Sequence, residues 1–517
     1  MRRCSRYILT ICLAVVVIDV VPSADHNSDT HVKMSLVATA PDAATHSDLA
    51  FWGKHAFIGY YRGDAQAGGG VRIFDISDPA NPTLVKDINC DGPQADPIVW
   101  DRNGNGIADL LLVAVDRTMA SPNCGAARVE HDNPFGWEGV RVFELSDDPA
   151  DPFATITQVA AVYTDCGARS ITLWPGKAAE GKLIVYVSSY PLRPGPTCGQ
   201  DRWSNAGNPY DHDPPSAAGP LHGVIQIVEV PLSTPGLARE IAQRPISYPG
   251  DPDGRMEWCE RGSGFCPPFF EVAARGCSSI TVHVGGRLAV GACAEQAQIW
   301  SIDEDGIPDT QNPLLVFDDE ISSGGTGNIP GAVDSFDSAT FSNDGKIANV
   351  VDQSFGAGCP TATAWFARPW HPAATHATGR MFFLDSATGE LLSEFKVGDV
   401  RPDTDPDAYC PPGRGAVVRS IARRVLVTPW YNGGVNLLDF TNPRQLREIA
   451  HYDQAASGGI WSAYGYAGPS FHAGGYPVYA SDGVQNRVNA KGLVVFKAVL
   501  ENISSFRLGH LNPQTVQ

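Results

Sequence analysis

The stretch SDLAFWGKHAFIGYYRGDAQAGGGVRIFDISDPANPTLV, residues 47–85, decides the fold. It contains four short runs that are rich in apolar and β-branched residues, and the breaks between them are rich in Gly, Pro, Asp or Asn. Such runs predict strands joined by tight turns, because these side chains favour the pleated backbone and these turn residues favour chain reversals. The stretch therefore predicts one four-stranded antiparallel sheet.

The third run of this unit recurs along the chain. The further copies are VRVFELSDDPADP from Val140, IQIVEVPLSTP from Ile225, AQIWSIDEDG from Ala297, MFFLDSATGE from Met381, VNLLDFTNP from Val435 and LVVFKAV from Leu493. First runs begin near Ser47, Pro97, Ser170, Ser279, Ser338, Ser420 and Ser462. The closest spacings are about 40 to 50 residues, which is the period of a propeller blade. The sequence therefore predicts an all-β, seven-bladed propeller of four-stranded antiparallel blades.

The copy VRIFDISDPANP resembles the third-strand consensus of the LVIVD-repeat proteins, a family of mainly bacterial β-propellers. The resemblance covers most of residues 45–500, although blades three, four and seven are loose copies. It implies a propeller that is secreted or exposed at the cell surface. It implies no reaction, because the family as a whole has none assigned.

The ends of the chain differ from the repeat. Residues 1–24 combine three Arg with an apolar stretch and small residues, which predicts a secretory signal peptide; an uncleaved anchor is the alternative. Residues 25–500 are then the propeller, and the segment 31–40 is expected to supply its closing strand beside residues 493–499. Residues 501–517 are expected to form a peripheral C-terminal tail.

The chain is acidic, with a formal net charge of −19, and only 18% of its residues are charged. An acidic surface argues against nucleic acid and anionic membranes as partners, because both repel it. No other long apolar segment follows the leader. We therefore expect a monomeric protein, secreted or at the cell surface, without a transmembrane segment in its mature form.

Ten cysteines remain after the leader, and an even number in an exported chain predicts disulfides. Their places in the repeat put them on connections that emerge on one face. The expected pairs are Cys90 with Cys124, Cys166 with Cys198, Cys259 with Cys266, Cys277 with Cys293, and Cys359 with Cys410. A metal site is the alternative, although the chain contains no CxxC pair.

The residue that precedes the small residue of each first strand should ring the axis of the propeller on that same face. These residues are His46, Asp96, Arg169, Ser278, Asp337, Arg419 and Trp461. Side chains of this kind can orient a small polar or anionic ligand through charge-assisted hydrogen bonds. The alternative is a ring of salt bridges that satisfies itself.

The segment DRNGNGIAD, residues 101–109, resembles the calcium loop of integrin-type propeller repeats. Side-chain oxygens of Asp101, Asn103 and Asn105, the carbonyl of Ile107 and the carboxylate of Asp109 can wrap a Ca²⁺ ion. A plain Asn-Gly turn is the alternative. A weaker second candidate comprises Asp303, Asp305, Ile307 and Asp309. Both loops belong to the face opposite the cysteines, so calcium would be structural.

Function is less well determined by the sequence than fold. The chain has no GxSxG elbow, no HExxH, no Walker loop and no Rossmann fingerprint. We expect a calcium-braced, disulfide-stapled binding module for a small polar ligand or an extracellular protein or glycan. The alternative is a secreted hydrolase or metal-dependent oxidoreductase with its site at the axis mouth, because propellers carry both classes of function.

Overall fold

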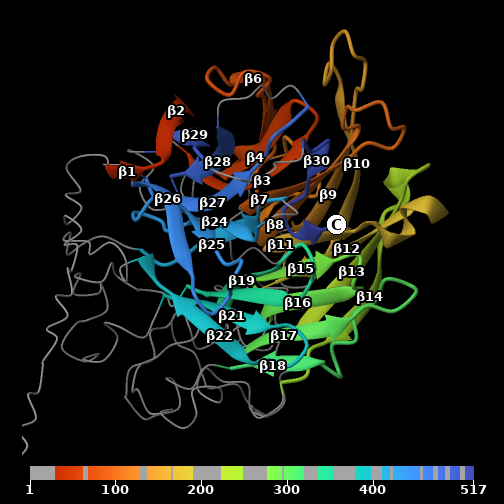
Figure 1. Cartoon of the computed structure of the whole chain (residues 1–517). Coiled ribbons are helices and arrows are strands. Elements are labelled where there is room, and N and C mark those ends of the chain that lie inside the picture. The colour runs from red at the N-terminus through yellow and green to blue at the C-terminus, as the bar shows by residue number, and fades with distance from the viewer. Residues whose placement is uncertain are drawn as a thin grey trace, which may run out of the picture.

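The computed structural model describes the chain from residue 30 onwards, with gaps. The described ranges are 30–42, 44–61, 68–92, 94–126, 137–164, 167–189, 223–248, 276–293, 296–318, 336–353, 379–397, 410–419, 423–453, 458–469, 475–483, 490–500 and 507–517. Sheets are arranged around a common centre in Figure 1, from the red and orange strands through green to blue.

The first half of the described chain forms three sheets. A five-stranded sheet of order β30-β3-β4-β5-β6 consists of β3 (Thr45–Trp52), β4 (His55–Tyr61), β5 (Gly69–Asp75), β6 (Thr83–Asn89) and β30 (His510–Leu511). A four-stranded sheet consists of β7 (Gln94–Trp100), β8 (Leu110–Ala120), β9 (Trp137–Leu145) and β10 (Ile156–Tyr163). The next consists of β11 (Ser170–Trp174), β12 (Lys182–Ser188), β13 (Val224–Pro231) and β14 (Arg239–Pro245), with short 3-10 helices η1 (Pro175–Glu180) and η3 (Pro235–Leu237).

Two further sheets follow in the chain. One consists of β15 (Ser279–His283), β16 (Leu288–Cys293), β17 (Gln296–Ser301), β18 (Leu315–Phe317) and β31 (Thr515–Val516). The other consists of β19 (Phe336–Phe341), β20 (Ile347–Asp352), β21 (Met381–Asp385) and β22 (Leu391–Phe395).

The remaining sheet has nine strands in the order β1-β26-β25-β24-β23-β27-β28-β29-β2. Its strands are β23 (Arg414–Val417), β24 (Val425–Pro429), β25 (Val435–Asp439), β26 (Arg447–Asp453), β27 (Ile460–Gly465), β28 (Tyr476–Asp482), β29 (Gly492–Ala498), β1 (Thr30–Val32) and β2 (Met34–Ala40). A parallel pairing of β23 with β27 joins its two antiparallel halves.

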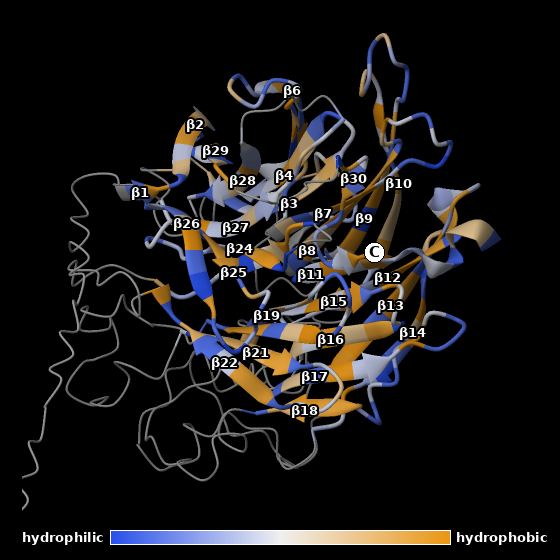
Figure 2. Cartoon of the chain, in the orientation of Figure 1, coloured by the Kyte–Doolittle hydropathy of each residue, from blue (hydrophilic) through white to orange (hydrophobic). Residues whose placement is uncertain are grey.

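The first strands are buried, and the fourth strands of several units are much more exposed. Every residue of β3 is buried, whereas most residues of β6 and β14 are exposed or half-buried. Hydrophobic residues follow the strands in Figure 2, and hydrophilic ones gather in the turns. Facing sheets share their apolar cores: Phe57 and Ile73, for example, belong to the same buried cluster as Leu111. The sequence prediction of four-stranded antiparallel sheets in a propeller-like arrangement is therefore confirmed.

The first strands contact one another in a cycle. β3 contacts β7, and the contacts continue through β11, β15, β19, β23 and β27 back to β3. The centre of this cycle is called the axis below. One first strand differs from the sequence prediction, because β23 begins at Arg414 rather than near Ser420.

The amino-terminal strands belong to two different halves of the nine-stranded sheet. β1 pairs antiparallel with β26, and β2 pairs antiparallel with β29 at its outer edge. Met34 lies opposite Ala498 in this ladder. Residues from the beginning of the described chain are thus hydrogen-bonded to strands more than four hundred residues later.

Residues 507–517, called the C-terminal strap below, cross the ends of the first strands near the axis, where Figure 1 marks the C-terminus. β30 pairs antiparallel with the end of β3, and β31 pairs parallel with the end of β15. Asn512 exchanges two hydrogen bonds of 3.0 Å with the backbone of Val99. The Thr515 hydroxyl donates to the carbonyl of Leu173 at 2.7 Å.

The strap corrects the expectation of a peripheral tail. Leu511, Asn512, Gln514, Thr515 and Val516 are each at most 7% exposed. The segment is buried because it pairs with strand ends that would otherwise leave backbone groups unsatisfied near the axis.

Candidate functional site

Six of the seven side chains expected at the mouth of the axis lie at or next to the start of a first strand. They are His46, Asp96, Arg169, Ser278, Asp337 and Trp461. Each is at most 5% exposed. The side chains predicted to face a ligand are therefore packed inside the protein.

Arg169 connects several of these residues. Its Nε donates to Ser278 Oγ at 3.0 Å and its Nη2 to Asp337 Oδ1 at 3.3 Å. Ser278 Oγ in turn donates to the same Asp337 oxygen at 2.6 Å. The guanidinium carbon lies 5.6 Å from the ring centroid of Trp461, within the range of a cation–π contact.

Arg414, at the start of β23, completes the group and was missed by the sequence prediction. Its Nη1 lies 3.2 Å from Asp48 Oδ2 and 3.5 Å from Asp96 Oδ2, and its Nε lies 4.0 Å from Asp337 Oδ2. Its guanidinium carbon lies 5.5 Å from the ring centroid of Trp461. We call the set Asp48, Asp96, Arg169, Ser278, Asp337, Arg414 and Trp461 the axial cluster.

A signal for Arg414 exists in the sequence. Expected ring residues precede a small residue, and both Arg414-Gly415 and Arg419-Ser420 fit that rule five residues apart. The structure selects the first pair. A Cβ on Gly415 would lie 2.1 Å from the carbonyl oxygen of Val427, so only glycine fits where β23 meets β24.

Burial and neighbouring charge act together on the cluster. Burial, reinforced by the Asp48 carboxylate, raises the pKa of Asp96 to about 7, although Arg414 opposes the rise. For Arg414, burial works to lower the pKa, but the surrounding carboxylates of Asp337, Asp48 and Asp96 outweigh it and raise the pKa. Arg414 therefore stays charged, while Asp96 can exchange a proton near neutral pH.

The axial cluster and the strap are connected through Asp48. Gln514 Nε2 donates to Asp48 Oδ2 at 2.6 Å, and the hydroxyl of Tyr464 donates to Oδ1 of the same carboxylate. Asp48 thus pairs with Arg414 on one side and with the strap on the other.

His46, in β3, is buried and contacts groups outside the axial cluster. Its Nδ1 lies 2.9 Å from the carbonyl oxygen of Asp482, and its Nε2 lies 3.5 Å from an Asp42 carboxylate oxygen. Burial lowers the pKa of His46 to about 4, so the ring is neutral at pH 7.

Arg419 lies at the other end of the axis, which corrects its predicted place in the ring. It follows β23, and its guanidinium donates to the carbonyls of Thr515 and Gln517 and to Asn343 Oδ1 at 2.9, 3.0 and 3.2 Å. The sequence prediction started this first strand near Ser420, but β23 ends at Val417, before Arg419. The same error in strand position caused Arg414 to be missed.

The predicted calcium loop, residues 101–109, joins β7 to β8. Both carboxylate oxygens of Asp101 accept backbone N–H groups, of Gly104 and Gly106, at 2.7 Å each. Asp109 accepts from Arg102, whose Nε lies 3.0 Å from Oδ2. The loop has the donor types that suit Ca²⁺, but a bound ion would have to compete with these hydrogen bonds and with the Arg102 charge.

The side chains of Asn103 and Asn105, two other expected calcium ligands, also form hydrogen bonds within the protein. Each donates from its side-chain amide to Oδ2 of Asp147, and the Asn105 contact measures 3.0 Å. Asn105 Oδ1 accepts from the backbone of Ile107 at 2.8 Å. Asp147 is therefore an additional carboxylate that could join a calcium site.

The second candidate loop lies between β17 and β18. Asp303 Oδ1 accepts the backbone N–H groups of Asp305 and Ile307 at 2.9 and 2.8 Å, and Asp309 accepts from Asn312. Within the described ranges, no group of three or more His, Cys, Asp or Glu side chains is placed to hold a metal ion. Calcium at either loop stays a prediction.

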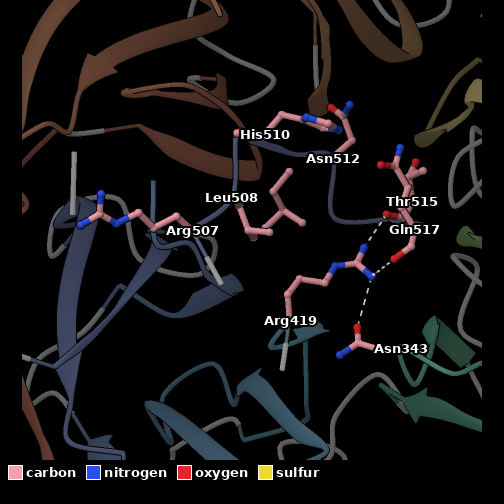
Figure 3. A pocket seen from close by; sticks show the side chains of 10 residues that line it. Asn343, Arg419, Arg507, Leu508, His510, Asn512, Thr515 and Gln517 are labelled. Atoms are coloured by element: carbon pink, nitrogen blue, oxygen red, sulfur yellow. Dashed lines mark hydrogen bonds between the residues drawn. The ribbon is translucent and has the colours of Figure 1, made fainter. Parts of the chain in front are cut away.

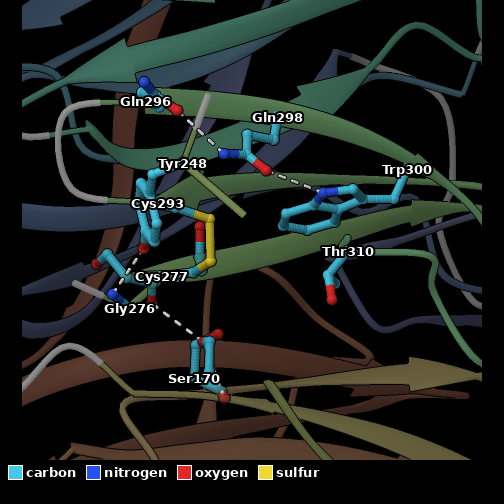
Figure 4. The surroundings of a disulfide bond; sticks show 12 residues. Ser170, Tyr248, Gly276, Cys277, Cys293, Gln296, Gln298, Trp300 and Thr310 are labelled. Atoms are coloured by element: carbon cyan, nitrogen blue, oxygen red, sulfur yellow. Dashed lines mark hydrogen bonds between the residues drawn. A yellow bond between two sulfur atoms is a disulfide. The ribbon is translucent and has the colours of Figure 1, made fainter. Parts of the chain in front are cut away.

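Two disulfides join described residues, Cys90–Cys124 and Cys277–Cys293, and both are among the pairs expected from the sequence. The second lies beside Gln298, which accepts from Trp300 Nε1 at 3.1 Å (Figure 4). Cys410 is also disulfide-bonded. Cys359, the expected partner of Cys410, lies outside the described residues. The other two expected pairs, Cys166 with Cys198 and Cys259 with Cys266, also lie outside them.

No family model matches this chain, and no curated protein matches it. The LVIVD resemblance therefore stays a prediction. In the described part of the chain, no helix has the length and apolar character needed to cross a membrane.

Several solved structures are similar in fold. Sqt1 from Chaetomium thermophilum is 12% identical, with a TM-score of 0.44 over 90% of this chain and 91% of its own. A putative 6-phosphogluconolactonase from Bacteroides uniformis is 10% identical, with a TM-score of 0.42 over 85% and 94%. Raptor from Chaetomium thermophilum is 9% identical, with a TM-score of 0.45 over 90% of this chain, which spans only 29% of Raptor. At these scores the likenesses carry no argument about function.

Proposed function

We propose that this protein is an exported interaction module, built as a seven-bladed propeller that its N-terminal strand closes. The cycle of first-strand contacts and the pairing of β2 with β29 support this architecture. The two disulfides fit an oxidising compartment outside the cytosol. Calcium at the loop 101–109 is part of the proposal and would brace a turn.

The observation that carries the proposal is the pairing within the axial cluster. Arg169 and Arg414 are directed at buried carboxylates, and the ring of Trp461 lies over both guanidinium groups. We infer that these buried, mutually neutralising charges fix the positions of the first strands relative to one another. The axis then serves as a rigid frame, and the partner, an extracellular protein, a glycan or a small polar ligand, contacts the loops and faces around it.

One observation favours the alternative, a secreted enzyme that works at the axis mouth. The pKa of Asp96 is raised to about 7, and perturbed carboxyl groups gather at active sites. Such a carboxyl could act as a general acid or base, with Arg414 stabilising negative charge beside it.

One variant separates the two functions. Asp96→Asn keeps an oxygen that can accept the backbone N–H of Ile171, now bonded to Asp96 at 3.1 Å, but it cannot exchange a proton. The oxidised protein is tested on glycan and extracellular-protein arrays, and for turnover on a panel of esters, lactones and reducible substrates. Saturable binding that survives Asp96→Asn supports the interaction module. Turnover that disappears in this variant, while its melting temperature is no lower than that of the wild type, would overturn it in favour of the enzyme.

A further inference from the structure

We propose that a cavity at the strap end of the axis binds a small organic anion through a carboxylate or phosphate group. The cavity has a volume of about 450 Å³ and lies between the C-terminal strap, Arg419 and Asn343 (Figure 3). This volume falls within the range of about 300–1,000 Å³ that is usual for small-molecule sites. The site is distinct from the axial cluster, and its existence does not depend on the proposed interaction function.

The charge of the cavity differs from the charge of the protein. Arg419, Arg507 and His510 are its ionisable side chains, and its described lining includes no Asp or Glu. The chain as a whole carries a formal net charge of −19. An anion is repelled by most of such a surface, so a cavity with two guanidinium groups and no carboxylate side chain is a local site of attraction.

Arg419 is held in a fixed orientation and retains binding capacity. Its three hydrogen bonds, to Thr515, Gln517 and Asn343, use three of the five N–H donors of a guanidinium. No ion pair within the described ranges includes Arg419. None of its three acceptors is an Asp or Glu side chain, although one of them is the backbone oxygen of Gln517 at the end of the strap. Burial lowers the pKa of Arg419 to about 10, so it is still charged at pH 7.

Arg507 and His510 are the other ionisable residues of the lining. Arg507 is exposed, and in Figure 3 Leu508 lies between it and Arg419. Among the described residues, Arg507 donates one hydrogen bond, to the carbonyl of Pro469 at 3.3 Å. The ring of His510 stacks on Trp52 at a centroid distance of 4.4 Å. Burial lowers the pKa of His510, although a hydrogen bond to Gln517 opposes the shift, so the ring is neutral at pH 7.

This chemistry selects the ligand class. A guanidinium binds planar carboxylates and phosphates through paired hydrogen bonds, which a neutral sugar cannot match. Leu508 and Leu511 also line the cavity, so a compact ligand with some apolar surface fits better than a large sugar. We therefore expect carboxylates or phosphates of small organic molecules.

The test uses the full, oxidised protein with citrate and inorganic phosphate as separate probes and glucose as the neutral control. Calorimetry and melting temperature are measured at constant ionic strength, adjusted with NaCl. The variants are Arg507→Gln and Arg419→Gln. Arg444→Gln is the matched control, because Arg444 pairs with Glu390 on an exposed surface away from the cavity.

Saturable binding of citrate or phosphate, with no effect of glucose, is the expected result. Loss of a charged hydrogen-bond donor should weaken binding by about tenfold or more in Arg419→Gln and by a smaller factor in Arg507→Gln, with no change in Arg444→Gln. Binding of citrate alone would assign a carboxylate ligand, and binding of phosphate alone a phosphate ligand.

The proposal is overturned if neither anion binds saturably, or if the Arg444→Gln control weakens binding as much as the cavity variants do. Arg419→Gln also loses two hydrogen bonds to the strap, so its melting temperature is recorded in parallel. If that variant unfolds, Arg507→Gln decides the matter, and wild-type affinity in Arg507→Gln overturns the proposal.

Discussion

Replacing Arg414 by Met should destabilise the protein more than any surface arginine does. Met has a similar length but no charge, so Asp48, Asp96 and Asp337 would lose the cation they share. All three carboxyl groups are at most 2% exposed, so water cannot take over this role. Removing one partner of a buried ion pair leaves an uncompensated charge and costs about 3–5 kcal/mol.

The size of the effect on melting follows from chain length. At about 2.1 cal/mol/K of unfolding entropy per residue, a chain of 517 residues loses ~1 °C for each kcal/mol, so Arg414→Met should melt ~3–5 °C lower. Differential scanning calorimetry of the oxidised protein at pH 7 measures this shift. Adding Asp48→Asn should recover part of the loss, because it removes one of the stranded charges.

Arg444→Met is the control for this measurement. Arg444 and Glu390 form an ion pair at 2.6 Å, but their side chains are 55% and 56% exposed. Such surface pairs contribute about 0–1 kcal/mol, so the control should melt within ~1 °C of the wild type. If Arg414→Met behaves like this control, the axial cluster does not stabilise the fold and the argument fails.

Four further results are expected. Deleting residues 507–517 should lower the melting temperature and speed amide hydrogen exchange at Val99, because the strap supplies both of its partners; an unchanged melting curve would contradict the strap's role. Asp96 has a raised pKa, so between pH 3.8 and about 7 the folded protein holds a proton that the unfolded chain has released, and the free energy of unfolding falls by up to ~4 kcal/mol as pH rises through this window. Asp96→Asn should remove this pH dependence from the urea unfolding midpoint, and identical midpoint profiles for the two proteins would refute the reasoning. If the loop 101–109 binds Ca²⁺ with a Kd of about 0.1–1 mM, a Ca²⁺ concentration well above this Kd should raise the melting temperature by ~1–3 °C. EDTA should reverse the shift and Asp101→Asn should abolish it, whereas no shift in the wild type would favour the plain turn. Replacing Cys90 and Cys124, which close a loop of 34 residues, by Ala should cost ~4 kcal/mol in chemical denaturation, and a loss below ~1 kcal/mol would show that the reduced chain is equally constrained.

The parts of the fold that could be predicted are those that depend on short, local sequence patterns. The strand VRIFDIS and its copies carry their own turns, so the four-stranded sheets could be read from short windows. Cys90 and Cys277 could be paired with their partners because their positions in the repeat place them on one face.

The parts that were missed depend on contacts between distant residues. The strap segment HLNPQTV has no strand-like pattern of its own and becomes ordered only against the ends of β3 and β15. Two Arg-small pairs lay within six residues of each other, and only the fit of Gly415 against Val427 shows which one faces the axis. No local signal could have distinguished them without the neighbouring strand.

The pairing of both chain ends with distant strands has a consequence for biosynthesis. β2 needs β29 as its neighbour, and the strap needs the first strands of several sheets. Both β29 and the strap are synthesised last, so earlier intermediates expose strand edges that invite aggregation. Such a high-contact-order chain folds slowly and benefits from delaying compaction until synthesis has finished. A chaperone or a translocation route that keeps the polypeptide extended would provide that delay.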